Sequence, residues 1–195
     1  MQGTLTIMDD PDLKDERLAA QVQGGDSEAF GTLMARYQPK LARYGSRFLA
    51  RSDDVEDIVQ DIFVNVYRNI KGFDSSQRFS PWIYRIAHNA FVNELRRKSR
   101  TPIRIPDFDL LALHTPSGER ADDLSEHESL ARLVESGLAG IDPKYREVLI
   151  LYFMEELSYR EIADVLRIPV ATVGVRLLRA KNALKKEYAN RNISL

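Results

Sequence analysis

The stretch "LSYREIADVLRIPVATVGVRLLRAKNALKKEY" (residues 157–188) has the pattern of a helix-turn-helix. Ser158 and Glu161 stand at the spacing of a capping box, which predicts the start of a short helix. Ala163 is small enough for a second helix to cross closely, and the tight turn "RIP" follows. Pro169 then opens a longer, basic helix that runs to about Tyr188. The pattern predicts a second helix that can enter the major groove of DNA.

The second helix of this motif is amphipathic. A helical wheel places Val173, Leu177, Ala180 and Leu184 on one face, which predicts that this face packs inward. The candidate DNA contacts lie on the other face and its flanks: Ala171, Thr172, Val175, Arg176, Arg179, Lys181 and Lys186. We expect Thr172 and Arg176 near base edges and the lysines on phosphates. A plain three-helix bundle with a solvated basic face remains the alternative. The same face carries the uncharged residues Gly174, Val175 and Leu178. Exposed apolar groups at these positions could contact either thymine methyl groups or a protein partner.

Charge is segregated along a chain whose net charge is only −1. Residues 78–104 hold seven basic residues and one acidic residue, and residues 160–191 hold eight and three. Between these two blocks, residues 105–136 hold eight acidic and two basic residues. Two basic blocks on patterned helices indicate a polyanion that is contacted at two places.

Composition excludes several classes of protein. The chain has no cysteine, so disulfides and thiolate metal sites are excluded, and the three histidines match no metal-ligand spacing. Glycine-rich nucleotide-binding motifs are absent, and we expect no metal and no cofactor. The acidic N-terminus is not a signal peptide, and no apolar run is long enough to cross a bilayer. We therefore expect a cytoplasmic protein without membrane insertion.

Helical periodicity extends over the N-terminal half. One predicted helix carries an apolar face from Phe30 to Tyr44, with Pro39 as a possible bend or end. The next begins at a cap on Ser52 or Asp53 and carries an apolar stripe to Ile70. A loop over residues 73–80 leads to a helix that Ser80 caps and Pro81 opens.

The fold class that follows is all-α, with two small helical domains joined by a flexible linker. The expected boundaries are an N-terminal tail (1–12), a helical domain (13–100), an acidic Pro-containing linker (101–127), a helix-turn-helix domain (128–190) and a C-terminal tail (191–195). We expect the linker to screen the two basic surfaces when the protein is free.

Three segments resemble the bacterial extracytoplasmic-function (ECF) sigma factors of RNA polymerase, in the order and spacing of that family. They are "DDVEDIVQDIFVNVYRNI", "FSPWIYRIAHNAFVNELRR" and "YREVLILYFMEELSYREIADVLRIPVATVGVRLLRAKNAL". The resemblance implies a non-enzymatic transcription initiation factor. Such a protein binds core RNA polymerase, recognises the −35 and −10 elements of promoter DNA, aids melting and is often controlled by an anti-sigma factor.

The resemblance also implies roles for individual residues. The polar stripe of the helix at 53–70 would bind core polymerase through Asp57, Gln60, Asp61 and Val64. The −10 element would be contacted by the loop and the basic helix that follows it: Ser75, Ser76, Gln77, Arg78, Arg85, Asn89, Arg96, Arg97 and Lys98. The −35 element would be contacted by the residues named above on the last helix. Trp82 lies at the edge of the core face, so it could either pack in the core or contact DNA.

Three other functions compete with this interpretation. A sigma-like regulator would sequester an anti-sigma factor without directing transcription, but the basic stripe and the helix-turn-helix are both present. A helix-turn-helix repressor would dimerise through its N-terminal half. A nucleic-acid enzyme would need a convergent set of carboxylates or metal ligands, and the acids at 53–61 are instead capping and surface positions.

Overall fold

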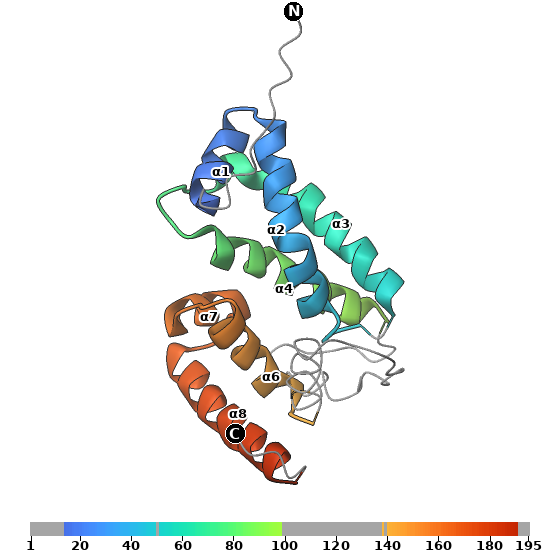
Figure 1. The fold of residues 1–195 in the computed structure, drawn as a ribbon, viewed down its shortest axis with the longest axis vertical. Coiled ribbons are helices and arrows are strands. Elements are labelled where there is room, and N and C mark those ends of the chain that lie inside the picture. Colours follow the sequence, from blue (N-terminus) through green and yellow to red (C-terminus); the bar gives the residue numbers. More distant parts are fainter. Residues whose placement is uncertain (1–13, 50, 99–137, 139, 191–195) are drawn as a thin grey trace, which may run out of the picture.

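A computed structural model describes residues 14–49, 51–98, 138 and 140–190 of the chain. All regular elements in these ranges are helical, and they form two groups that stack along the long axis of the molecule (Figure 1). The N-terminal group contains α1 (Asp15–Gln23), α2 (Ser27–Gly45), α3 (Ser52–Asn69), the 3₁₀ turn η1 (Ile70–Gly72) and α4 (Phe79–Lys98). The C-terminal group contains α6 (Pro143–Leu149), the π-helical turn η3 (Ile150–Met154), α7 (Tyr159–Leu166) and α8 (Val170–Asn190).

The apolar stripes that define the N-terminal group are buried as predicted. Helix α2 buries Leu33, Tyr37, Leu41 and Tyr44, and α3 buries Val55, Val59, Ile62, Phe63 and Val66. Helix α2 continues through Pro39, so this proline does not end it. At the end of α2, Gly45 lies so close to α4 that an added Cβ would meet the Phe91 ring at 2.3 Å. The absence of a side chain at Gly45 therefore sets how closely α2 and α4 approach.

Two predicted helix starts were wrong by one or two residues. Helix α3 begins at Ser52 itself, after Arg51, which makes no side-chain capping bond. Helix α4 begins at Phe79, two residues before Pro81. Phe79 is fully buried, and its backbone N–H donates to Glu16 Oε1 of α1 at 2.9 Å. A cap from a distant helix thus fixes the start of α4, and local capping signals do not contain it.

The helix-turn-helix forms as its sequence predicts. The Ser158 side chain accepts from the N–H of Glu161, and the Glu161 carboxylate accepts from the N–H of Ser158, which completes the capping box. Arg167 ends α7 in the left-handed region with φ of 53°, and this conformation makes the tight turn into α8. Val173, Leu177 and Ala180 are buried, so α8 packs on its predicted inner face.

The segment before this motif departs from a single α-helix. Asp142 caps α6 by accepting from the N–H of Lys144 at 3.1 Å. The helix then widens into the π-helical turn η3, and Glu156 follows in the left-handed region with φ of 52°. Residues 146–151 are all buried. This segment is therefore covered on all sides, by α8 of its own group and, at Glu147, by the N-terminal group.

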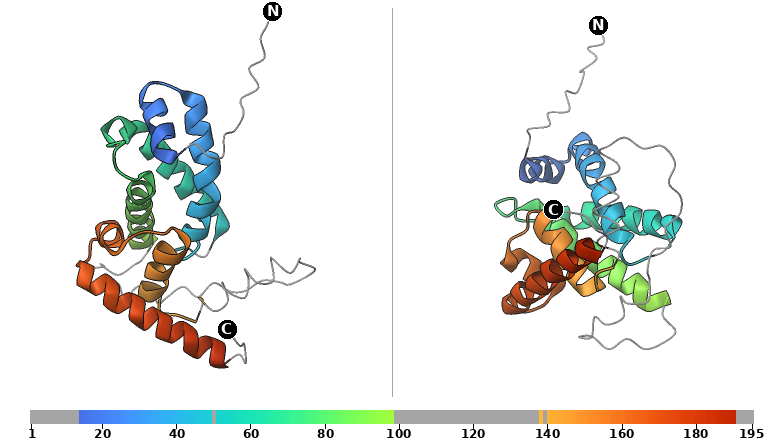
Figure 2. Two further views of the ribbon diagram at one scale, coloured as in Figure 1. Left: turned by 60° about the vertical axis from the view of Figure 1, so that its left-hand side comes forward. Right: turned by 60° about the horizontal axis from the view of Figure 1, so that its bottom comes forward.

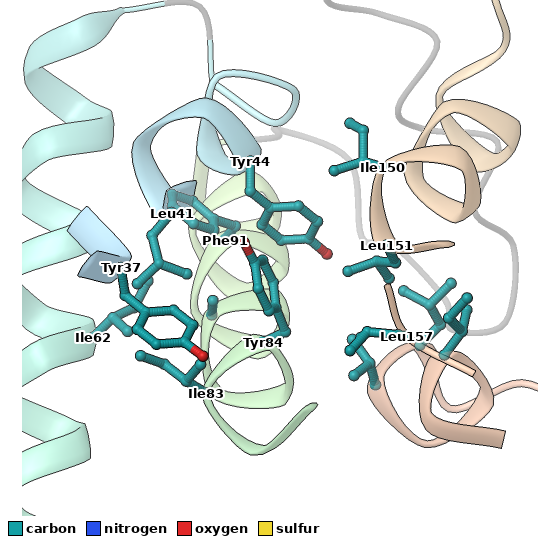
Figure 3. Packing of buried hydrophobic residues seen from close by; sticks show 14 of the residues in the cluster. Tyr37, Leu41, Tyr44, Ile62, Ile83, Tyr84, Phe91, Ile150, Leu151 and Leu157 are labelled. Carbon is teal, nitrogen blue, oxygen red and sulfur yellow. The ribbon is translucent and has the colours of Figure 1, made fainter. Parts of the chain in front are cut away.

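The two groups share one apolar core. Helix α7 packs against α4, and the two views of Figure 2 show the C-terminal group lying across the end of the N-terminal one. Figure 3 shows Tyr44 and Tyr84 facing the segment that carries Ile150, Leu151 and Leu157, and these side chains belong to the same buried cluster. In the part of the chain that is described, no helix is long and apolar enough to cross a membrane.

Candidate nucleic-acid interface

The outer face of α8 has the predicted exposure. Ala171, Val175, Arg179, Lys181 and Lys186 are exposed, and Thr172 and Arg176 are half-buried at its flanks. Two large apolar side chains stand among these cations, because 50% of Val175 and 63% of Leu178 are exposed.

Neighbouring aromatic side chains hold two of the cations on α8. The guanidinium of Arg179 donates to the Tyr145 hydroxyl at 3.2 Å, and the Lys181 ammonium lies 5.2 Å from the centre of the Phe153 ring. Such contacts restrict the side chains without neutralising their charge. The face is therefore cationic with an apolar centre.

The loop before α4 presents its polar residues to solvent. Ser75, Ser76 and Gln77 are exposed. The Asp74 carboxylate accepts from the Ser76 hydroxyl at 2.7 Å and from the Ser76 N–H at 3.0 Å, and these hydrogen bonds lower the pKa of Asp74. Phe73 and Phe79 are buried on either side of the loop and anchor it to the core.

Trp82 packs against both anchors of this loop. Its ring lies 5.1 Å from that of Phe73 and 5.6 Å from that of Phe79, centre to centre. The side chain is half-buried, and its remaining surface lines a pocket of about 310 Å³ with Gln77, Arg78 and Arg85. Trp82 therefore packs against the core with one part of its ring and lines the pocket with the other.

The basic stripe of α4 is only partly available to a ligand. Arg85 is exposed, whereas Asn89 and Arg96 are half-buried. At the end of the helix, Arg97 forms a bidentate pair with Glu94, with both distances 2.7 Å. Lys98 pairs with Asp54 of α3.

The polar stripe of α3 borders an apolar groove that the sequence prediction missed. Asp57, Gln60, Asp61 and Val64 are all exposed, as expected. Beside them, a groove of about 730 Å³ opens between α2 and α3. Its apolar lining comes from Phe30, Met34, Val59, Phe63, Val64 and Tyr67, and 54% of Tyr67 is exposed.

The groove is absent from the prediction because Phe30 and Met34 share the helical period of the core residues of α2. Both are half-buried in the structure. Periodicity identifies an apolar face but does not show whether a neighbouring helix covers all of it. The sequence feature that could have indicated the groove is Tyr67, an aromatic residue on the exposed side of α3.

Two buried glutamates of the C-terminal group contact the N-terminal group. Glu147 Oε1 accepts from the Tyr44 hydroxyl at 2.5 Å and lies 2.8 Å from His88 Nδ1, and all three side chains are buried. Burial and the Glu147 carboxylate raise the pKa of Tyr44. The sequence places His88 near the basic face of α4 and leaves open whether it is structural or solvent-exposed; its burial shows that it is structural.

The second of these glutamates, Glu155, lies at the end of η3. Its carboxylate is 3.7 Å from the Lys40 ammonium and 3.9 Å from the Arg43 guanidinium, both on α2. Burial and the charge of Glu155 raise the pKa of Tyr84. Across the described residues, no group of acids and histidines is arranged to hold a metal ion.

Comparison with known proteins identifies the family. Residues 33–101 match sigma-70 region 2, and residues 131–184 match sigma-70 region 4. The ECF RNA polymerase sigma-E factor of Escherichia coli (strain K12) is 35% identical over 181 residues, which cover 88% of this chain and 93% of that protein. The chain belongs to the ECF RNA polymerase sigma factors.

Further relatives agree with this assignment. The sigma factor SigW of Bacillus subtilis (strain 168) is 32% identical over 179 residues, which cover 86% of this chain and 92% of SigW. The structure of CnrH in complex with the cytosolic domain of CnrY is 32% identical, with a TM-score of 0.61 over 88% of this chain and 95% of CnrH. The sigma factor RpoE of Bartonella quintana, solved with the anti-sigma factor NepR, shares the fold with a TM-score of 0.62 at 21% identity over 82% of this chain and 96% of RpoE.

This sigma factor directs RNA polymerase to promoters and is not an enzyme. The chain carries region 2 and region 4, so a simple repressor that dimerises through its N-terminal half does not describe it. The region 2 match spans α3 and α4, and the region 4 match spans α6 and α7 with most of α8.

Proposed function

We propose that this sigma factor divides its work among three surfaces. Helix α8 reads the −35 element, the loop at 73–78 with α4 reads the −10 element, and α3 with the neighbouring groove binds core polymerase. The observation that carries the proposal is that the three surfaces differ in chemistry. The first is cationic, the second joins a polar loop to a cationic helix, and the third is apolar with an acidic border.

The polymerase surface comprises the apolar groove and its polar border. Gln60 and Val64 line one side of the groove, and Tyr67 and Phe30 supply apolar area. Asp57 and Asp61 are exposed on the same helix, α3. Acidic groups beside a groove disfavour nucleic acid and favour a helical protein partner. In the family, the corresponding segment grips a coiled coil of the largest polymerase subunit.

The −10 surface centres on the pocket beside Trp82. Melted DNA exposes bases that can stack on aromatic rings and accept hydrogen bonds from serine and glutamine. Ser75, Ser76 and Gln77 supply such groups, while Arg78 and Arg85 lie beside them for the backbone. Asn89, Arg96, Arg97 and Lys98 continue the surface along α4.

The −35 surface is the outer face of α8. Thr172 and Arg176 lie in its first two turns, where a recognition helix meets base edges. Ala171 and Val175 are small enough for close approach, and Arg179, Lys181 and Lys186 follow the phosphates.

Regulation and location complete the proposal. Since CnrH and RpoE were each solved with another protein bound, the latter named an anti-sigma factor, we propose an anti-sigma partner for this chain. We place the protein in the cytoplasm, and we assign its −10 and −35 domains to residues 13–100 and 128–190, with the linker between them.

Promoter selection with reconstituted holoenzyme tests the division of labour. Core polymerase with this chain selects promoters from a randomised library, and the selection is repeated with Arg176→Ala and with Gln77→Ala. We expect the first variant to relax preference only at the −35 element and the second only at the −10 element. A variant that relaxes preference at the opposite element would overturn the assignment of its surface.

A further inference from the structure

Helix α1 contacts both ends of the loop that precedes α4 (Figure 1). At the first end, the side-chain amide of Gln23 donates from Nε2 to the backbone carbonyls of Ile70 and Phe73, both at 2.7 Å. At the other end, Glu16 Oε1 accepts from the backbone N–H of Phe79 at 2.9 Å. Two polar side chains of one helix therefore hold the backbone on either side of the loop.

The spacing of these two side chains follows from the helix. Glu16 and Gln23 are seven positions apart, which is about two helical turns, so they lie on one face and about 10 Å apart along the axis. The buried residues of α1 lie on the neighbouring face: Leu18, Ala19 and Val22. Helix α1 thus packs in the core with one face and binds the loop with another.

The hydrogen bonds of Gln23 require an amide. Both of its partners are carbonyl oxygens, so the amide nitrogen, which carries two hydrogens, must face them. An aliphatic side chain or a carboxylate at this position would supply neither bond. The Ile70 carbonyl also accepts from the N–H of Phe73 at 3.0 Å, where η1 ends. Gln23 therefore joins the end of η1 to the first residue of the loop.

Helix α1 is itself fixed to α2. Asp15 Oδ1 lies 2.9 Å from Arg36 Nη1, and Asp15 Oδ2 accepts from the Tyr37 hydroxyl at 2.7 Å. The Tyr37 ring lies 5.4 Å from the ring of Phe79, centre to centre. The same part of α2 thus contacts both α1 and the residue at which α4 begins, so α1 holds the loop in a fixed position relative to α4.

The loop between the two points of attachment is exposed. Residues 74–78 are all exposed. The Asp74 side chain accepts from Ser76, and the Asp74 carbonyl accepts from the N–H of Gln77 at 2.9 Å. These bonds fix the shape of the turn, but each joins two residues of the turn, so they do not fix its place on the domain. The bonds to α1 set where the loop presents its polar side chains.

We propose that Glu16 and Gln23 are positioning residues for promoter recognition, which hold the loop in the conformation that binds the −10 strand. The proposal rests on the −10 assignment made above, and it adds two residues that act through the loop. Both precede residues 33–101, the part of the chain that matches sigma-70 region 2. A loop that is already held binds a strand more tightly, because less conformational entropy is lost on binding. The ordering of one backbone residue corresponds to about tenfold in affinity.

The test removes each hydrogen bond and keeps the length of the side chain. Glu16→Met deletes the acceptor, and Gln23→Met deletes the donor. Glu16→Gln keeps an acceptor oxygen and has the same charge as Glu16→Met, so it separates loss of the bond from loss of the charge. Gln21→Met, at an exposed site of the same helix, is the control for the introduction of methionine.

Each variant is reconstituted with core polymerase, and fluorescence anisotropy measures binding to a promoter fragment whose −10 region is single-stranded. We expect Glu16→Met and Gln23→Met to bind about tenfold more weakly, and Glu16→Gln and Gln21→Met to bind as the wild type does. Affinity for core polymerase and preference at the −35 element should not change.

A double-mutant cycle provides a readout that a purely structural role would not move. If α1 acts through the loop, Gln77→Ala removes part of what Gln23 positions. The loss caused by Gln23→Met should therefore be smaller, by about threefold or more, in the Gln77→Ala background. Strict additivity of the two substitutions would mean that α1 does not act through the loop, which overturns the proposal.

The other outcomes are equally defined. Equal binding by Gln23→Met and Gln21→Met, or equal weakening by Glu16→Met and Glu16→Gln, would show that the hydrogen bonds to α1 do not matter. Equal losses of affinity for the −10 strand and for core polymerase would show a general loss of structure. Each of these results overturns the proposal. The −10 assignment is judged separately: unchanged −10 preference of Gln77→Ala in promoter selection would place the error in the proposed function.

Discussion

Neutralising the basic end of α4 offers a quantitative test of DNA binding. The perturbation is Arg96→Gln, Arg97→Gln and Lys98→Gln together. Each phosphate contact on a single strand contributes about 0.7 to the slope of log affinity against log salt. The sequence alone therefore predicts a slope reduced by about 2, which is three contacts at about 0.7 each.

The structure predicts a smaller change in the salt slope. Arg97 is already paired with Glu94, and Lys98 with Asp54 and Glu94. The contact with Arg97 lowers the pKa of Glu94, and that with Lys98 lowers the pKa of Asp54, so both partners are anions at neutral pH. A cation that binds a phosphate releases a counterion from the DNA. If that cation leaves a carboxylate to do so, the carboxylate binds a cation from solution, and the net release of counterions is zero. Only Arg96 makes no ion pair with a described residue, so the slope should fall by about 0.7.

The assay uses holoenzyme reconstituted with each variant and a promoter fragment whose −10 region is single-stranded. Affinity is measured over a series of KCl concentrations. The matched background is Glu94→Gln with Asp54→Asn, which removes the two carboxylates. In that background the triple substitution should reduce the slope by the full amount of about 2.

Two results would refute this reasoning. A full reduction in the wild-type background would mean that Glu94 and Asp54 do not hold these cations in solution. An unchanged slope in both backgrounds would mean that the end of α4 contacts no phosphate.

Three further predictions concern packing, polymerase binding and −35 recognition. Gly45→Ala should lower the free energy of unfolding by about 1–3 kcal/mol, since its Cβ would overlap the Phe91 ring, whereas Gly31→Ala in the same helix meets nothing within 4 Å and should raise it by about 0.5–1 kcal/mol. Urea unfolding distinguishes these signs. Asp61→Arg should weaken core polymerase binding about tenfold or more with native circular dichroism, through like-charge repulsion, and undiminished pull-down would exclude this surface. Replacing thymine by uracil in the −35 element should weaken binding about fourfold if Leu178 covers the methyl group, and Leu178→Ala should remove that difference; an equal loss in both proteins would instead favour a protein partner for Leu178.

Local patterns predict most of the secondary structure of this chain. The capping box at Ser158 is a property of a few adjacent residues, and it forms as expected. The inward face of α8 follows from helical period alone. The predicted start of a helix is wrong where a residue distant in sequence determines it, as when Glu16 of α1 accepts a hydrogen bond from the first N–H of α4.

The packing between the two groups was not predicted, because it depends on contacts between distant residues. His88 is buried through Glu147, which lies 59 positions away. One sequence signal existed: Glu147 precedes the apolar run "VLIL" and so stands in a segment with no exposed side. A lone acid at such a position indicates a polar partner elsewhere, although the sequence does not identify it.

The position of Trp82 gives the protein an optical property. It is the only tryptophan in the chain, and its half-buried ring lines the pocket that Glu161 and Asp164 share. Indole emission depends on solvent contact and on charges near the ring, and both change when a base enters the pocket. The chain thus has its single indole fluorophore at the junction of its two halves. Rapid-mixing fluorescence can follow the order of polymerase docking and promoter capture without attaching a dye.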